Sequence, residues 1–208
     1  MIKTALLPTA YLPPIQYYSK LLVYPQVIIE HYEHFPKQTY RNRSYILSPN
    51  GKLLLVVPLK SRTERTITKD IRISYNDNWQ KLHWRSMEAA YRRSAYFEYY
   101  EDELHPFYTE KKFEFLIDLN MALTGLINSL LKINFTPGST SRYEELYVDY
   151  KDFRSTLSPK VDFSTDPEYQ VKIYPQVFDT KQDFIPNLSI VDLLFNQGPG
   201  ALDYLNPS

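Results

Sequence analysis

The sequence predicts an α/β fold, namely a mixed sheet with a β-helix-β opening and a hairpin, packed with a layer of two to three helices. Three observations predict it: two short apolar runs flanking a helical pattern near the N-terminus, a turn tetrapeptide between two β-rich runs, and two helical patterns in mid-chain. A length of 208 residues suits one domain. We expect residues 1–208 to form it, with 134–166 as a less ordered insertion.

The β-helix-β opening and the hairpin follow from local patterns. Residues 4–8 and 26–30 resemble short buried strands, and the segment IQYYSKLLV between them carries apolar residues at helical spacing near 15–23. Two β-rich runs follow at 39–48 and 53–59, separated by Ser48-Pro49-Asn50-Gly51. Proline fixes φ and Asn and Gly tolerate positive φ, so this tetrapeptide predicts a hairpin.

Two long helices should cover the sheet. The first is capped by Asn76 or Asn78 and runs to about Arg93, with Trp79 and Leu82 starting its buried face. The second covers roughly 110–132, and its latter half is nearly free of charge, so we expect it to be central. Its apolar stripe would consist of Phe113, Leu116, Ile117, Asn120, Leu123, Ile127 and Leu131.

Shorter elements complete the prediction. A short helix between the two long ones should end near His105-Pro106, because proline disfavours α geometry in the residue before it. Residues 169–178 alternate as a strand, and Pro175 places that strand at an edge or a bulge. A final helix, SIVDLLFN, should stop at Gly198-Pro199-Gly200.

Composition excludes several classes of function. The chain has no cysteine, which removes disulfides, thiolate catalysis and Cys-ligated metals, and which suits a reducing compartment such as the cytoplasm. Twenty-four basic residues balance 24 acidic ones, so no overall field recruits nucleic acid or an anionic membrane. The N-terminus does not read as a signal peptide, and no apolar run is long enough to insert into a membrane. The five glycines form no phosphate-binding motif.

The first candidate for chemistry is the segment Glu30-His31-Tyr32-Glu33-His34. Two histidines three residues apart could serve as metal ligands or as a base and its orienting partner. The spacing is not that of H-E-x-x-H, and Pro36 favours a loop, so the sequence favours no metal site. His31 remains a candidate catalytic residue, and solvated loop histidines are the alternative.

The start of the hairpin carries amide and guanidinium groups. Alternation along a strand would place Gln38, Tyr40 and Asn42 on one face, and Thr39, Arg41 and Arg43 on the other. Arginine binds phosphate and carboxylate oxygens in a bidentate manner, so Arg41 and Arg43 are candidate anchors for an anionic substrate. Arginines that merely solvate a strand are the alternative.

The first long helix contributes a histidine. His83 lies one turn from Trp79 and from Ser86, so it could line a cleft as a general base or be satisfied within the core. A Ser86-His83 nucleophilic pair is disfavoured, because a helical serine one turn away rarely exposes its hydroxyl along a line of attack. Arg92 and Arg93 follow, where a helix C-terminus favours cations.

The last helix begins with a polar segment. Ser189 and Asp192 have the S-x-x-D spacing of a capping box, which would explain both residues structurally. Alternatively, Asn187 and Asp192 point into a cleft at the helix N-terminus, where bare N–H groups would hold an anion.

Several short motifs, together with their order along the chain, resemble the WbqC-like family nearly from end to end. Members usually open with Gln-Pro before the tyrosine, whereas this chain has Leu7-Pro8 ahead of Tyr11. The Pro-Asn-Leu-Ser…Asp-Leu-Leu-Phe-Asn ending is the most distinctive motif. The segments are Tyr11-Leu12-Pro13, Lys37-Gln38-Thr39-Tyr40-Arg41-Asn42-Arg43, Trp79-Gln80-Lys81-Leu82-His83, Tyr91-Arg92-Arg93-Ser94-Ala95-Tyr96-Phe97 and residues 186–196.

The resemblance implies a bacterial protein associated with O-antigen and other surface polysaccharides (lipopolysaccharide), and it supplies neither a mechanism nor a cofactor. Mapped onto this chain, the family's recurrent polar positions are Gln38, Asn42, Arg43, His83, Tyr91, Tyr174, Gln176, Asn187 and Asp192. We expect Gln38, Asn42, Arg43 and His83 to share one pocket.

Two functional hypotheses follow. The first is a transferase that moves an acyl or aminoacyl group onto an amino sugar or sugar nucleotide, with His83 or His31 as general base and Arg41 and Arg43 gripping a phosphate. The second is a non-catalytic accessory protein that docks on a glycosyltransferase or carrier protein through exposed aromatic residues around 96–108.

Overall fold

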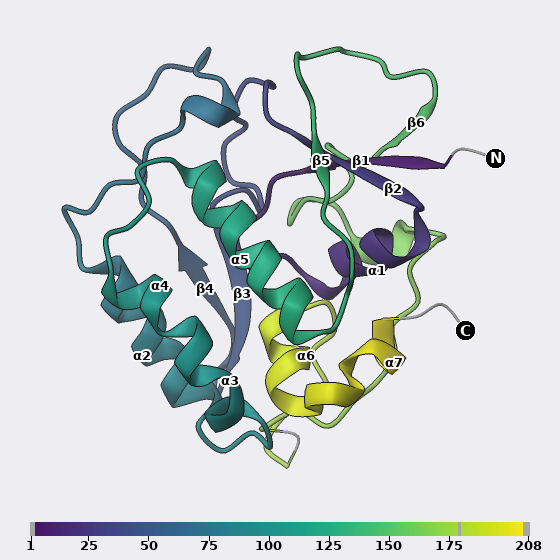
Figure 1. The fold of residues 1–208 in the computed structure, drawn as a ribbon. Helices are drawn as coiled ribbons and strands as arrows, with labels where there is room; N and C mark the ends of the chain where they lie inside the picture. Colours follow the sequence, from purple (N-terminus) through teal and green to yellow (C-terminus); the bar gives the residue numbers. More distant parts are fainter. Residues whose placement is uncertain (1–2, 179, 206–208) are drawn as a thin grey trace.

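The computed structural model describes residues 3–178 and 180–205. It confirms the α/β class, with a four-stranded parallel sheet and a separate two-stranded antiparallel hairpin among helices. In Figure 1 the parallel sheet lies at the upper right, and α2, α3 and α4 lie beside the hairpin at the lower left. No helix in the described part of the chain has the length and apolar character that a membrane span requires.

The parallel sheet grows from the predicted β-helix-β opening. β1 (Thr4–Pro8) pairs in parallel with β2 (Gln26–Glu30), and α1 (Ile15–Val23) connects them. Every residue of β1 is buried, as expected for a parallel strand covered on both faces.

Two further strands complete this sheet from a segment in which the sequence predicts none. β5 (Gly138–Ser139) pairs with β2, and β6 (Tyr150–Asp152) pairs with β1, giving the order β5-β2-β1-β6. At Gly138 an added Cβ would lie 2.9 Å from the terminal methyl group of Ile28, so a larger residue there would require the Ile28 side chain to shift. Residues 134–166 therefore contribute to the sheet.

The hairpin consists of β3 (Arg43–Ser48) and β4 (Gly51–Val56), and Ser48 faces Gly51 across the predicted turn. Gly51 adopts φ +97°, which confirms the reason for glycine at this position. The prediction that β3 starts at residue 39 is wrong. Residues 39–42 form a turn and a bend instead, and Gln38 before them has φ +61°, a left-handed conformation that no strand accommodates.

The first long helix is α2 (Trp79–Tyr91), and it follows Asn78 as predicted, although the Asn78 side chain makes no capping hydrogen bond. Trp79 is buried, but Leu82 is 65% exposed, so the prediction that Leu82 starts the buried face is wrong. That face continues from Trp79 through His83, Met87 and Ala90, in steps of four and three residues, which excludes position 82.

The second long helix is α5 (Leu116–Leu130), which starts six residues later than predicted. Phe115 forms a β-bridge with Arg72, and this extended pairing delays the start of the helix. Phe113 lies outside α5, but the other predicted stripe residues, from Leu116 to Leu131, are buried.

Between these helices lie α3 (Phe97–Leu104) and α4 (Pro106–Thr109), so the short helix ends at the predicted place. The predicted reason is wrong, because His105 keeps α geometry with φ −53° and ψ −39°. Short 3₁₀ turns occur at Thr68–Asp70, Phe163–Thr165 and Gly198–Gly200. The final predicted helix is α6 (Ile190–Gln197), capped by Ser189 and stopped at Gly198, and α7 (Ala201–Leu205) follows it.

The strand predicted at 169–178 does not form among the described residues. Pro175 has no N–H to donate to a neighbouring strand. Tyr174 and Gln176 instead use their side chains to bind a buried carboxylate, that of Asp192.

Candidate functional site

The carboxyl ends of the four parallel strands meet at one edge of the sheet. Glu30 ends β2, and Glu33 follows three residues later. Asp152 ends β6, and Arg154 follows it. The chain adds β2 and β5 on one side of β1 and β6 on the other, and in open parallel sheets ligands bind at the carboxyl edge where the strand order reverses. We therefore take this edge as the candidate functional site.

A cleft of about 440 Å³ lies at this edge, and its volume falls within the range of small-molecule sites. Residues from the β2–β3 connection and from both sides of β6 line it. They are Glu33, Pro36, Thr39, Arg41, Tyr143, Glu145, Asp152, Arg154, Ser155 and Ser158.

Arg41 and Glu33 form a buried pair in the wall of the cleft. Arg41 Nε donates to Glu33 Oε1 at 2.6 Å, and Arg41 Nη2 lies 2.5 Å from the same oxygen. Burial raises the pKa of Glu33 above its usual value, and the Arg41 guanidinium partly opposes that rise. Among the described residues no hydrogen bond reaches the second oxygen, Glu33 Oε2.

Arg154 is the second guanidinium of the cleft, and it is held on several sides. It binds Glu30 Oε2 at 3.0 Å and Asp152 Oδ2 at 2.6 Å. Its guanidinium lies over the rings of Tyr143 and Tyr147, 5.2 and 5.3 Å from their centroids. Both arginines of the cleft are therefore already paired with carboxylates, and a phosphate would have to compete for them.

The charge of the lining favours a cation. Three carboxylates, from Glu33, Glu145 and Asp152, line the cleft with two arginines. Arg154 also neutralises Glu30, which lies behind the lining. The excess of carboxylate, together with the exposed ring of Tyr143, matches a ligand that carries an amine on a ring.

His31 follows β2 but does not line this cleft. Its Nε2 is buried and has no hydrogen-bond partner among the described residues. Burial lowers the pKa of His31, while Glu30 and Asp118 act in the opposite direction. In the described ranges 3–178 and 180–205, no three His, Asp or Glu side chains are grouped to hold a metal ion.

His83 lies within the core and is 2% exposed. Its Nδ1 is 2.9 Å from the Tyr11 hydroxyl, which in turn is 3.0 Å from the hydroxyl of Tyr108. A second hydrogen bond links the imidazole to the backbone of Val56. Burial lowers the pKa of His83 to about 4, so the ring is neutral at pH 7 and its hydrogen-bonding groups are engaged within the protein.

None of the five cavities described in this structure is lined by Gln38, Asn42, Arg43 or His83, the residues expected to share one pocket. Gln38 is exposed, and Asn42 is buried and donates to the Val57 carbonyl at 2.9 Å. Arg43 is half-buried, and its Nε has no partner among the described residues. Of the predicted site residues, only Arg41 lines any of the five cavities described in this structure.

Four predicted site residues do come together, in a buried network around Asp192. Tyr91 and Tyr174 donate their hydroxyls to Asp192 at 2.8 and 2.6 Å, and Gln176 Nε2 donates at 3.0 Å. Burial raises the pKa of Asp192 to about 6, and the three hydrogen bonds limit that rise. The network links α2, α6 and the 174–176 segment.

The start of α6 distinguishes the two explanations that the sequence leaves open. Ser189 Oγ accepts from the Val191 N–H at 3.4 Å, so Ser189 caps the helix. Asp192 does not complete a capping box, because the Ser189 N–H donates to the Tyr45 carbonyl. Asn187 instead accepts from the Gln16 N–H at 3.0 Å, at the start of α1.

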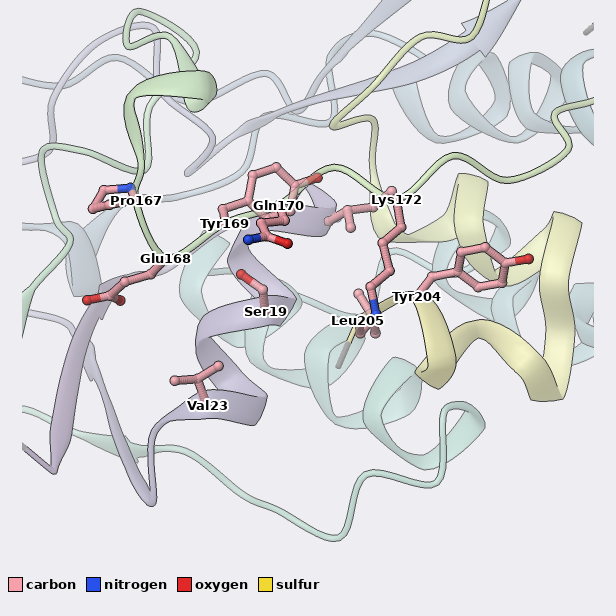
Figure 2. Close-up of a pocket in the computed structure, with 10 residues that line it drawn as sticks. Ser19, Val23, Pro167, Glu168, Tyr169, Gln170, Lys172, Tyr204 and Leu205 are labelled. Carbon is pink, nitrogen blue, oxygen red and sulfur yellow. The ribbon is translucent and has the colours of Figure 1, made fainter. Parts of the chain in front are cut away.

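A smaller hollow of about 160 Å³ lies between α1, the 167–172 segment and α7. Figure 2 shows Ser19 of α1 beside Gln170 of the 167–172 segment, with Tyr204 and Leu205 at the α7 end. Glu168 and Lys172 balance each other in charge, and no predicted site residue lines this hollow.

Comparison with known proteins identifies the family of this chain. The sequence profile of the WbqC-like protein family matches residues 9–155 and 146–204. The chain belongs to the WbqC-like protein family. The resemblance predicted from the short motifs is thereby confirmed.

A relative of similar length, aligned along nearly the whole of both chains, supports the same assignment. Uncharacterized protein Rv1507c of Mycobacterium tuberculosis is 31% identical over 232 aligned positions, which cover 99% of this chain and 98% of the relative. No solved structure matches this WbqC-like chain.

Sequence reasoning missed most of the cleft of this WbqC-like protein. In the sequence Glu33 stands out only as the residue between two histidines, and Tyr143, Asp152 and Arg154 lie in the segment predicted to be a less ordered insertion. One signal could have found Glu33, since polar residues directly after a buried parallel strand point to the carboxyl edge of the sheet.

Proposed function

We propose that this protein acts in surface-polysaccharide biosynthesis, and that its carboxyl-edge cleft holds an amino sugar, either free or as part of a sugar nucleotide. The amine of that sugar would receive an acyl or aminoacyl group. Membership of the WbqC-like family supports the polysaccharide context, because the family's name is associated with O-antigen biosynthesis. The acceptor is inferred from the cleft itself.

The observation that carries this proposal is that the arginines lining the cleft are already paired with carboxylates. Both of its guanidinium groups, Arg41 and Arg154, are bound to carboxylates, and the lining still has one carboxylate more than it has arginines. Such a lining attracts an ammonium group and offers no unpaired cation to a phosphate, so the phosphates of a sugar nucleotide would have to lie outside the cleft. The ring of Tyr143 at the rim offers a surface on which a sugar ring can pack.

The chemistry of transfer assigns a role to Glu33. The sugar nitrogen would attack the carbonyl carbon of an activated acyl donor and form an amide, while the bond from that carbon to the donor's oxygen or sulfur breaks. Glu33 would first take one proton from the bound ammonium group and so free the lone pair for attack, since its Oε2 is unpartnered among the described residues and its raised pKa suits a general base. The leaving group would depart with the electron pair of the broken bond and take up the second proton from the nitrogen.

His83 and His31 remain the bases predicted from the sequence. Glu33 is better placed than either, because it lines the cleft, whereas His83 is 2% exposed and hydrogen-bonded at both ends of its ring.

Calorimetric titration with glucosamine and with N-acetylglucosamine tests the acceptor. The two sugars share a ring and differ at the amine, so we expect glucosamine to bind and N-acetylglucosamine to bind at least about tenfold more weakly. Glu33→Gln and Glu145→Gln should each weaken the binding of glucosamine, and Glu64→Gln, which removes an exposed carboxylate outside the cleft, should leave it unchanged.

Equal affinity for the two sugars would contradict the proposal, as would a Glu64→Gln effect equal to that of Glu145→Gln. Silence towards every sugar, together with co-purification of a glycosyltransferase or a carrier protein, would favour the accessory-protein hypothesis. In the segment predicted to dock, Tyr99 is 71% exposed, whereas Phe97, Tyr100 and Tyr108 are buried.

A further inference from the structure

An open groove of about 600 Å³ runs beside the C-terminal half of α2, and the proposed function does not use it. The hairpin turn and the 177–178 segment form its other walls. Its lining consists of Pro49, Arg85, Glu88, Ala89, Ala90, Arg92, Arg93, Val177 and Phe178.

The groove is basic. Three arginines face one glutamate, which gives it an excess of positive charge. Of the other four cavities described here, two have linings balanced in charge and two have an acidic excess. An anionic ligand would therefore be attracted here rather than to the other four.

The arginines of the groove differ in how they are held. Arg92 is fixed by Glu88 at 2.8 Å and by Glu101 at 3.4 Å, and its guanidinium lies 5.3 Å from the ring centroid of Phe97. Arg85 and Arg93 are exposed, and among residues 3–178 and 180–205 neither has an ion-pair or hydrogen-bond partner. These two guanidinium groups are free to bind oxygens of a ligand.

The distance between the two free arginines, and the apolar wall that faces them across the groove, indicate the class of ligand. Arg85 and Arg93 lie eight residues apart on or just beyond one helix, which corresponds to a rise of about 12 Å. Ala89 lies between them, and its small side chain leaves space above the helix. Val177 and Phe178, which are partly buried, form an apolar wall of the groove. An anion with a flat ring attached would suit both walls, because its anionic group would meet the arginines and its ring would meet Phe178.

We propose that the groove between α2 and the 177–178 segment binds a nucleoside diphosphate through Arg85 and Arg93, with the base against Phe178. The groove shares no lining residue with the carboxyl-edge cleft, so this site is separate from the proposed amino-sugar site.

Calorimetric titration of the whole protein with ADP, UDP and inorganic pyrophosphate tests the site. We expect ADP and UDP to bind, and the double variant Arg85→Ala/Arg93→Ala to lose at least about tenfold in affinity for both. Phe178→Ala should weaken ADP and UDP but not pyrophosphate. Lys81→Ala removes an exposed cation from the same helix outside the groove and serves as the matched control.

Three outcomes would overturn the site: no binding of ADP or UDP at about 5 mM, an unchanged affinity in the double variant, or an equal loss in Lys81→Ala. An acidic peptide that binds more tightly than ADP and UDP would also overturn it, in favour of a protein partner. Glucosamine binding by the double variant should equal that of the parent protein, which separates this test from that of the amino-sugar site.

Discussion

At the scale of single residues, Asp192 is the acceptor at the centre of a buried hydrogen-bond network. It is fully buried and accepts hydrogen bonds from two hydroxyls and an amide, with no cation among its hydrogen-bond partners in the described chain. Its raised pKa shows that burial outweighs those hydrogen bonds. The Asp192 carboxylate therefore joins α6 to α2 and to the 174–176 segment, and the cost is the removal of its charge from water.

Replacing Asp192 by Ala should destabilise the protein by about 3 kcal/mol, because three buried donors lose their acceptor. Urea unfolding followed by circular dichroism measures the change. Asp77→Ala, which removes an exposed carboxylate, is the matched control and should stay within about 0.5 kcal/mol of the parent. Similar losses in the two variants would mean that the network contributes nothing specific.

His83 gives a second prediction, and it concerns pH. Its pKa falls from 6.5 in the unfolded chain to about 4 in the folded protein, so between these values the unfolded state holds more protons. The contribution of neutral His83 is thus complete above pH 6.5 and is lost as the pH falls towards 4. The difference between the two pKa values of His83 corresponds to a change of about 3 kcal/mol in the free energy of unfolding.

The measurement compares the free energies of unfolding of the parent and of His83→Gln from pH 4 to pH 7. The difference between them should grow as the pH rises, because Gln does not titrate. Asp192 acts in the opposite sense over pH 3.8 to about 6, since its folded pKa is raised, but it does so in both proteins and cancels in the difference. A difference independent of pH would mean that position 83 does not carry the shift.

At the scale of elements, the end of α6 depends on one glycine. Gly198 has φ +51°, and a Cβ added there would lie 2.5 Å from the ring of Tyr96. Both the backbone conformation and the space around it exclude a side chain.

Gly198→Ala should therefore lower the free energy of unfolding by more than about 1 kcal/mol, and Gly200→Ala is the control. Gly200 lies in the next turn, has no positive φ, and an added Cβ would meet nothing within 4 Å. Thermal unfolding of the two variants checks the expectation. Equal melting temperatures would show that Tyr96 moves aside at no cost.

The elements that the sequence predicts well are those specified by local pattern. The bounds of α1 agree with the prediction, and Gly51 forms the turn expected of it, because a 3.6-residue apolar period and a positive-φ glycine are local properties. β5 and β6 span two and three residues, so they carry no period, and their pairing is determined by distant strands. The 169–178 segment has the period of a strand, but Pro175 and the side-chain bonds of Tyr174 and Gln176 replace the pairing.

At the scale of the whole molecule, the order of the parallel sheet brings the cleft together. Glu33 and Arg41 follow β2, whereas Asp152 and Arg154 come more than a hundred residues later, beyond β5. Sequence reasoning could find Arg41 as a candidate anchor, but it could not find Arg154, because the position of β6 beside β1 is a non-local pairing. Arg41 is bound to Glu33, which lies eight residues earlier on the same β2–β3 connection, so its guanidinium is already paired with a carboxylate.

The proposed function requires an amino sugar to bind at the carboxyl edge of the parallel sheet. Titrating isotope-labelled protein with glucosamine and following backbone amide resonances tests it most directly. We expect the largest shifts at the amides of Glu33, Thr39, Tyr143 and Arg154, and little change when N-acetylglucosamine is added. Shifts that cluster instead around His83 and Asn42, or around the hollow between α1 and α7, would contradict it.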